Sequence, residues 1–96
     1  MAARAQRTLT FAVRGPISAC DLPGLCDRVC ALMTEARADA AVCDVRGVRP
    51  TAATVDALAR LQLAARRLGC QVRLSGASED LRELVAFMGL EDVLPE

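Results

Sequence analysis

The sequence contains no His, Lys, Asn, Trp or Tyr, and all 12 of its basic residues are Arg. The absence of His removes the usual general base, the usual proton shuttle and the commonest neutral metal ligand. No apolar run approaches the roughly 20 residues of a membrane span, and the N-terminus lacks the apolar stretch of a signal peptide. We therefore expect a cytoplasmic protein without direct membrane insertion. The dominance of Ala, Arg, Leu and Val indicates codon bias in a GC-rich bacterial genome.

Net charge is also absent, because 12 acidic residues balance the 12 Arg. Without a basic excess the chain has no field strong enough to hold nucleic acid, so no DNA or RNA partner is expected. A length of 96 residues and a hydrophobic content of 53% suit one layered core, but not two domains with a cleft between them. We expect a single domain over residues 1–96, with residues 1–6 flexible.

The five cysteines match no metal-binding or disulfide pattern. Their number is odd, no paired Cys-x-x-Cys motif is present, and Cys26 and Cys30 lie one helical turn apart among Leu and Val. Free thiols are often buried, where they pack as small hydrophobic residues, and this is our interpretation of all five. A thiolate metal site is the alternative. We expect no cofactor and no metal.

Three segments have the composition of strands. The stretch TLTFAVRG has β-formers in partial alternation before a Gly15-Pro16 turn, and the other two segments are AAVCDVRGV and CQVRLSG. The run of apolar residues at 40–48 predicts a strand buried on both faces, as parallel strands usually are.

Helices are predicted after each strand. The first follows Asp21 as cap, with Pro23 in its first turn and apolar residues at spacings of three and four. The second follows Pro50, with Thr51 or Thr54 as cap, and ends at Gly69. The third has Ser78 as cap, the acidic residues Glu79 and Asp80 in its first turn, and Gly89 at its end. Strand–helix alternation predicts an α/β fold with parallel pairing and right-handed crossovers.

The outer face of the middle helix is a candidate docking surface. At 100° per residue, one side of this helix is apolar and should face the sheet: Val55, Leu58, Leu61, Ala65 and Leu68. Leu63 falls on the opposite side among small and charged residues, namely Ala52, Asp56, Ala59, Arg60 and Arg67. Small neighbours would let another backbone come close. The alternative is that a single exposed Leu is normal on a protein surface.

Two further hypotheses concern the start of the same helix. Arg46, Arg49, Thr51 and Thr54 lie near its N-terminus and could hold an anion, although threonines there are commonly caps. Asp44 and Asp56 could in principle act as acid and base. We favour a loop-organising role for Asp44 and an exposed position for Asp56. Without His, Tyr, a nucleophile elbow or a metal motif, we expect no catalysis.

The order and wording of three segments resemble the STAS domain. "VRGPISACDLPGLCDRVCALM" is similar to the family's first strand, Gly turn and first helix, "VCDVRGVRPTAATVDALARL" to its central segment, and "LRELVAFMGLEDVL" to its closing helix and Gly-Leu end. The resemblance covers nearly the whole chain. It implies a STAS-like sandwich with a small, mostly parallel sheet of about four strands covered by helices. Anti-sigma factor antagonists, the small cytoplasmic subunit of the Mla lipid-transport complex and the tails of sulfate transporters share this fold.

One departure from the family bears on regulation. In phosphorylated members, a partner kinase modifies a Ser or Thr at the start of the second helix. With a one-residue shortening before it, that position falls on Ala52 and Ala53, which carry no hydroxyl. The phosphorylation switch at the usual position is therefore unavailable. A shifted alignment would make Thr51 or Thr54 the acceptor.

The resemblance implies a non-catalytic protein-interaction module. In this family the loop before the second helix and the helix itself bind the partner, which implies a surface made of Arg49, Thr51, Ala52, Asp56, Ala59 and Leu63. The expected partner is an anti-sigma factor or a related serine-kinase-like protein. The alternative is an accessory subunit of an ABC-type lipid transporter, bound to its permease or ATPase.

Overall fold

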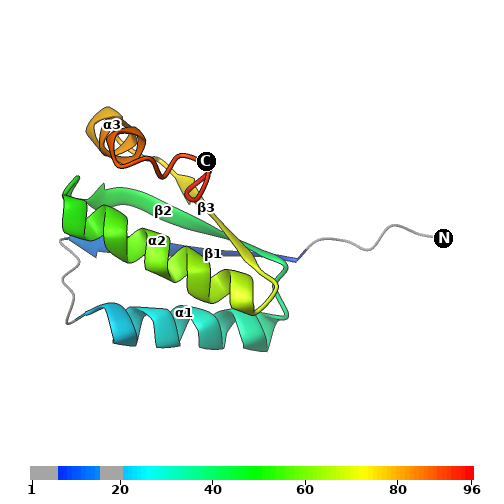
Figure 1. Cartoon of the computed structure of the whole chain (residues 1–96). Coiled ribbons are helices and arrows are strands. Elements are labelled where there is room, and N and C mark those ends of the chain that lie inside the picture. Colours follow the sequence, from blue (N-terminus) through cyan, green and yellow to red (C-terminus); the bar gives the residue numbers. More distant parts are fainter. Residues whose placement is uncertain (1–6, 16–20) are drawn as a thin grey trace.

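The computed structural model describes residues 7–15 and 21–96 (Figure 1). Three strands alternate with three helices in the predicted order: β1 (Thr8–Gly15), α1 (Leu22–Ala36), β2 (Ala40–Val48), α2 (Ala52–Arg67), β3 (Gln71–Ser75) and α3 (Glu79–Phe87). The predicted α/β class and element order are confirmed. The expected flexibility of residues 1–6, the Gly15-Pro16 turn and the packing of Cys20 lie wholly or partly outside the described residues.

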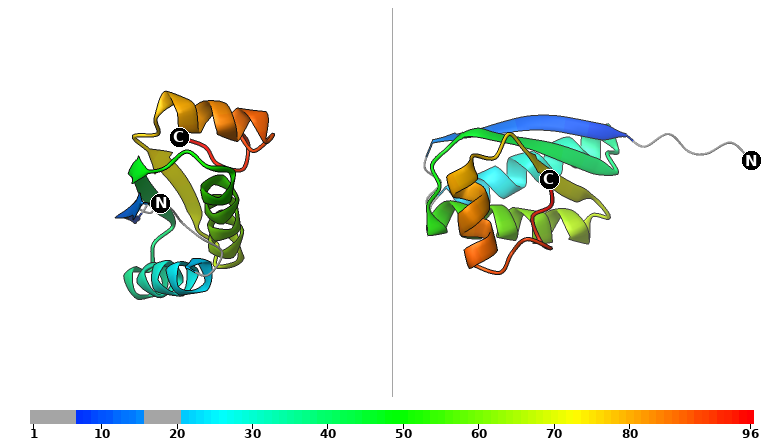
Figure 2. Two further views of the ribbon diagram at one scale, coloured as in Figure 1. Left: turned by 90° about the vertical axis from the view of Figure 1, so that its left-hand side faces the viewer. Right: turned by 90° about the horizontal axis from the view of Figure 1, so that it is seen from above.

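The sheet is parallel and its strands lie in the order β1-β2-β3. Both crossovers therefore move in the same direction across the sheet, and right-handed crossovers then place α1 and α2 on the same face. Figure 2 shows these helices on one side of the sheet, with α3 lying across the end where α2 begins. The described residues form three strands, whereas about four were expected from the family resemblance.

Because the helices cover one face, β2 is not buried on both faces as its composition predicted. Ala41, Cys43 and Val45 point toward the helices and are fully buried, whereas Val42 and Asp44 alternate with them and remain partly exposed. The small apolar residues of β2 suit close packing of helices on one side. The core lies between this face and the buried sides of α1 and α2.

Helix α2 is buried over a wider arc than its apolar stripe predicted. Four of the five predicted core residues are buried: Val55, Leu58, Leu61 and Ala65. Leu68 is instead 51% exposed, because the helix ends at Arg67 and Leu68 occupies the C-terminal cap position. Thr54 and Gln62, which lie within the same stripe, are buried as well, and Ala57 and Ala59 are buried outside it because α2 contacts α1 on one side and α3 on another.

The outer edge of β3 is covered by one side chain and by the C-terminal segment. The fully buried Gln62 donates its side-chain amide to the carbonyls of Val72, at 2.6 Å, and Val93, at 2.9 Å. The backbone N–H of Val72 donates to Oε1 of Gln62 at 2.7 Å. Further along the strand, the N–H of Leu74 donates to the carbonyl of Pro95 at 2.8 Å. Gln62 and Pro95 thus replace hydrogen bonds that a fourth strand would make.

Candidate functional site

The first part of the site lies within β2, where the Asp44 carboxylate binds the Arg46 side chain. The Asp44 carboxylate accepts hydrogen bonds from the backbone N–H of Arg46 at 3.0 Å and from its guanidinium at 2.7 Å. These hydrogen bonds, together with the charge of the nearby Arg14, lower the pKa of Asp44 to about 2. An always-ionised carboxylate engaged by a guanidinium is a poor general acid or base. Asp44 instead fixes a residue of its own strand, because Asp44 and Arg46 both lie within β2, and its predicted role as a loop organiser is not confirmed.

Gly76 lets the Arg46 side chain lie across the neighbouring turn. A Cβ on Gly76 would clash with Cγ and Cδ of Arg46, and the backbone φ of +71° is one that favours glycine. The Arg46 side chain is thus held between its own strand and the turn after β3. Arg46, one of the two arginines of the hypothetical anion site, already has a carboxylate partner and is therefore not a free anion-binding group.

The next element of the site is the cap of α2. The hydroxyl of Thr51 accepts a hydrogen bond from the backbone N–H of Thr54 at 3.1 Å and donates to the Thr54 hydroxyl at 3.0 Å. Of the two predicted caps, Thr51 is the one in place. The pair uses the first-turn amide that an anion would otherwise contact, which favours the capping role over an anion site.

The two alternative phosphoacceptors differ in access. Thr51 is exposed, but Thr54 has an exposed fraction of 0%. A kinase cannot reach a fully buried hydroxyl, so the prediction of Thr54 as an alternative acceptor is wrong for this folded state. Ala52 and Ala53 are both exposed at the first turn of α2, where they present methyl groups to solvent.

The outer face of α2 carries most of the predicted docking residues. Arg49, Thr51, Ala52, Asp56 and Leu63 are exposed, and Leu63 is 52% exposed. The predicted helical phase is therefore correct at Leu63. Asp56 is paired with Arg60 one turn later, at 2.9 Å, so this carboxylate also has a cationic partner.

Ala59 does not belong to the exposed face. It is 9% exposed and lies one turn from both Val55 and Gln62, which are fully buried. The sequence placed Ala59 outside because its calculated angle lies at the border of the apolar stripe. Because α2 is buried over a wide arc, Ala59 lies within the buried part of the helix. We therefore remove Ala59 from the candidate surface.

A second exposed group, which the sequence analysis missed, lies next to the loop before α2. Phe87 is 87% exposed at the end of α3, and it lines a shallow hollow with Pro50, Leu84, Asp80 and Glu83. The spacing 80, 83, 84, 87 is that of one helical face and was available in the sequence. The candidate docking surface is thus the outer face of α2 and the loop before it, bordered by Phe87.

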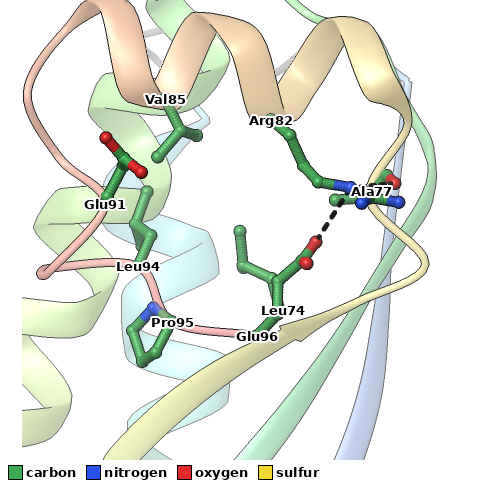
Figure 3. Close-up of a pocket in the computed structure, with 8 residues that line it drawn as sticks. All are labelled: Leu74, Ala77, Arg82, Val85, Glu91, Leu94, Pro95 and Glu96. Atoms are coloured by element: carbon green, nitrogen blue, oxygen red, sulfur yellow. Dashed lines mark hydrogen bonds and ion pairs between the residues drawn. The ribbon is translucent and has the colours of Figure 1, made fainter.

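A hollow near the C-terminus has a volume of about 220 Å³ (Figure 3). Its lining is largely apolar, with Leu74, Val85 and Leu94 among the contributors, and Arg82 faces Glu96 at 3.5 Å. It holds no pair of groups arranged as nucleophile and base. In the part of the chain that the structure describes, no group of three or more His, Cys, Asp or Glu is placed to hold a metal ion.

Of the four described cysteines, Cys43 and Cys70 are buried, as predicted, whereas Cys26 and Cys30 are only partly buried. Cys43 is fully buried, and burial raises the pKa of its thiol to about 12. Burial also raises the pKa of the Cys26 and Cys70 thiols. Because the thiolate is the reactive form and the metal-binding form, these thiols are poor nucleophiles and poor metal ligands at neutral pH.

We expect Cys43 to be silent toward a thiol reagent such as DTNB in the native protein at pH 8, and to react once guanidinium unfolds the chain. The Cys43→Ala variant should show the same native reactivity as the parent chain and one thiol fewer after unfolding. A lower native thiol count in Cys43→Ala would show that Cys43 is accessible and would contradict its assignment to the core.

Comparison with known proteins identifies the fold. No protein-family model matches the chain. No curated protein matches it either. The structure is similar to the crystal structure of a sulfate transporter family protein from Wolinella succinogenes, with a TM-score of 0.66 and 23% identity over 91% of this chain and 70% of that one. The chain therefore has the STAS fold, as the resemblance implied.

An identity of 23% establishes the fold alone. The candidate docking surface is inferred from the exposure and contacts of this chain's own residues. Among the described helices, none is both long and apolar enough to cross a membrane.

Proposed function

We propose that this chain is a non-catalytic binding module of STAS type, which docks a protein partner on the outer face of α2 and the loop before it. The observation that carries the proposal is Leu63, a large apolar side chain 52% exposed at the middle of that face. Exposed Ala52 and Ala53 lie at the start of the same helix and let a partner approach closely. Binding hot spots lie near the centre of an interface, surrounded by contacts that exclude water, and Leu63 has such a central position on this face.

The partner proposed first is an anti-sigma factor or a related serine-kinase-like protein in the cytoplasm. Ala52 and Ala53 at the acceptor position prevent phosphoryl charge from being added to the docking surface there, because no phosphate can be attached to them. Binding would then be regulated by the amounts of the proteins rather than by phosphorylation at this position.

The second candidate is an accessory subunit of an ABC-type lipid transporter that binds the permease or ATPase. Two observations favour it. A docking surface without a hydroxyl at the usual acceptor position suits permanent assembly, and the structure is similar to a protein described as belonging to a sulfate transporter family. The two candidates use the same surface and differ in the partner.

Affinity capture from the native cells tests the proposal and separates the two candidates. The tagged chain is washed gently, its bound proteins are identified by mass spectrometry, and tagged Leu63→Asp serves as the control. A kinase-like anti-sigma protein that is lost in the variant would support the first candidate, and a permease or ATPase lost in the variant would support the second. Recovery of the same proteins by both baits would refute docking at Leu63.

A further inference from the structure

The two edges of the sheet differ in whether their outward backbone groups are hydrogen-bonded. On β3, the outward-pointing backbone groups of Val72 and the N–H of Leu74 are bound by Gln62 and Pro95. On β1, the carbonyl of Arg7 accepts from the N–H of Ala40 on β2 at 3.3 Å. In a parallel pair the bonded residues alternate, so Thr8, Thr10 and Ala12 direct their N–H and C=O groups away from β2. None of the described residues covers this edge with a strand.

Residues 8–12 of β1 lack the side chains that usually protect an exposed strand. Between Thr8 and Ala12 there is no Lys, no Pro and no charged side chain, and the residues are mainly β-formers. The protective features of β1 lie beyond Ala12: the exposed Arg14 and the irregularity in the register between Ala12 and Arg14. This irregularity limits regular pairing to the five residues 8–12, and Thr10 is the centre of that stretch.

We propose that β1 pairs antiparallel with β1 of a second copy of this chain, about a two-fold axis at Thr10, to join two sheets into one. An antiparallel pair centred on Thr10 places Thr8 opposite Ala12 of the other copy and forms about six backbone hydrogen bonds from the outward groups. The regular stretch starts at Thr8 and ends at the irregularity after Ala12. A register centred on Thr10 therefore pairs the whole stretch with the same stretch of the second copy.

Side chains in this register are complementary on both faces. On the face without helices, Thr10 meets its own copy and Thr8 meets Ala12. On the helix face, Leu9 lies opposite Phe11 of the second copy, and both side chains are only partly buried in the isolated chain. Such apolar and Thr cross-strand pairs are favourable, and no Arg is placed directly opposite another Arg. The self-complementarity identifies a second copy, rather than an unrelated strand, as the occupant.

A cysteine at the two-fold axis tests the register. Directly opposite residues of this kind have Cα atoms about 5.5 Å apart, within the range that a disulfide spans. Thr10→Cys should therefore form a dimer under mild oxidation, with the linkage between the two introduced cysteines identified by peptide mass spectrometry. Thr8→Cys is the matched control: its two copies would lie roughly 13 Å apart and should not link to each other. Linking of Thr8→Cys but not of Thr10→Cys would overturn the register.

Analytical ultracentrifugation of the unmodified chain tests the association itself. We expect a concentration-dependent equilibrium between monomer and dimer. It should disappear in Thr10→Pro, which removes an outward N–H, and persist in Thr10→Val, which keeps it. Circular dichroism establishes that each variant is folded. A chain that is wholly monomeric at about 1 mM, where a dimer with a Kd of about 1 mM would contain half of the chains, would overturn the proposal. So would a dimer that Thr10→Pro leaves unchanged while Thr10→Cys fails to link.

Discussion

Replacement of Gln62 with leucine is expected to lower the free energy of unfolding by about 3 to 5 kcal/mol, although the two side chains have similar volumes. The Gln62 amide satisfies the N–H and carbonyl of Val72 and the carbonyl of Val93. Leucine leaves the N–H and carbonyl of buried Val72 and the partly buried carbonyl of Val93 without this partner, and each unsatisfied buried group costs about 1 to 3 kcal/mol. The polar side chain of Gln62 therefore contributes more to the free energy of unfolding at this buried position than an apolar side chain of similar volume would.

The measurement is chemical or thermal unfolding of the parent chain and of two variants. For a chain of this size, the loss predicted for Gln62→Leu lowers the Tm by at least about 12 °C. Gln71→Leu is the matched control, because it makes the same chemical change at an exposed position of β3 and should change stability by less than about 0.5 kcal/mol. Equal stability of the two variants would contradict the role assigned to Gln62 at the sheet edge.

Replacement of Leu63 with aspartate is expected to abolish partner binding without unfolding the protein. An exposed leucine at the centre of an interface contributes through the apolar surface that it buries, and a buried aspartate without a partner charge opposes binding further. We expect an affinity loss of at least about 100-fold, equivalent to about 2.7 kcal/mol. Because Leu63 makes little contact with the core, the Tm of this variant should differ from that of the parent chain by no more than a few degrees.

Leu68 provides the matched control for this variant. It is 51% exposed, against 52% for Leu63, and lies at the end of the same helix, away from the proposed docking face. Leu68→Asp makes the same change in charge and volume and should bind the partner as the parent chain does. A large fall in the Tm of Leu63→Asp would show that the side chain is part of the core and that the assigned helical phase is wrong.

The fold followed from the sequence because its signals are local. Alternation and turn residues define the strands, Thr51 and Ser78 occupy helix starts where their hydroxyls cap the helices, and Gly69 and Gly89 follow the ends of α2 and α3 with positive φ. The exposure of Leu63 followed from the period of α2 alone.

The errors come from contacts between elements that are distant in the sequence. Ala59 was placed at the surface because periodicity gives only the centre of a buried arc, whereas its width depends on how the neighbouring helices pack. Thr54 lies within the predicted apolar stripe, and its burial contradicts only its role as an alternative acceptor. The role of Gln62 depends on the C-terminal segment and on the free edge of β3, neither of which leaves a local signal. The exposure of Phe87 is likewise set by where α3 lies against the rest of the fold.

Docking of a protein partner on the outer face of α2 can be tested by titration. The partner recovered by affinity capture is purified and titrated calorimetrically with the parent chain, with Leu63→Asp and with Leu68→Asp. We expect saturable binding by the parent chain and by Leu68→Asp, and no measurable binding by Leu63→Asp at the same concentrations. Equal affinities for all three, with all three folded, would show that the partner binds elsewhere and would contradict the account.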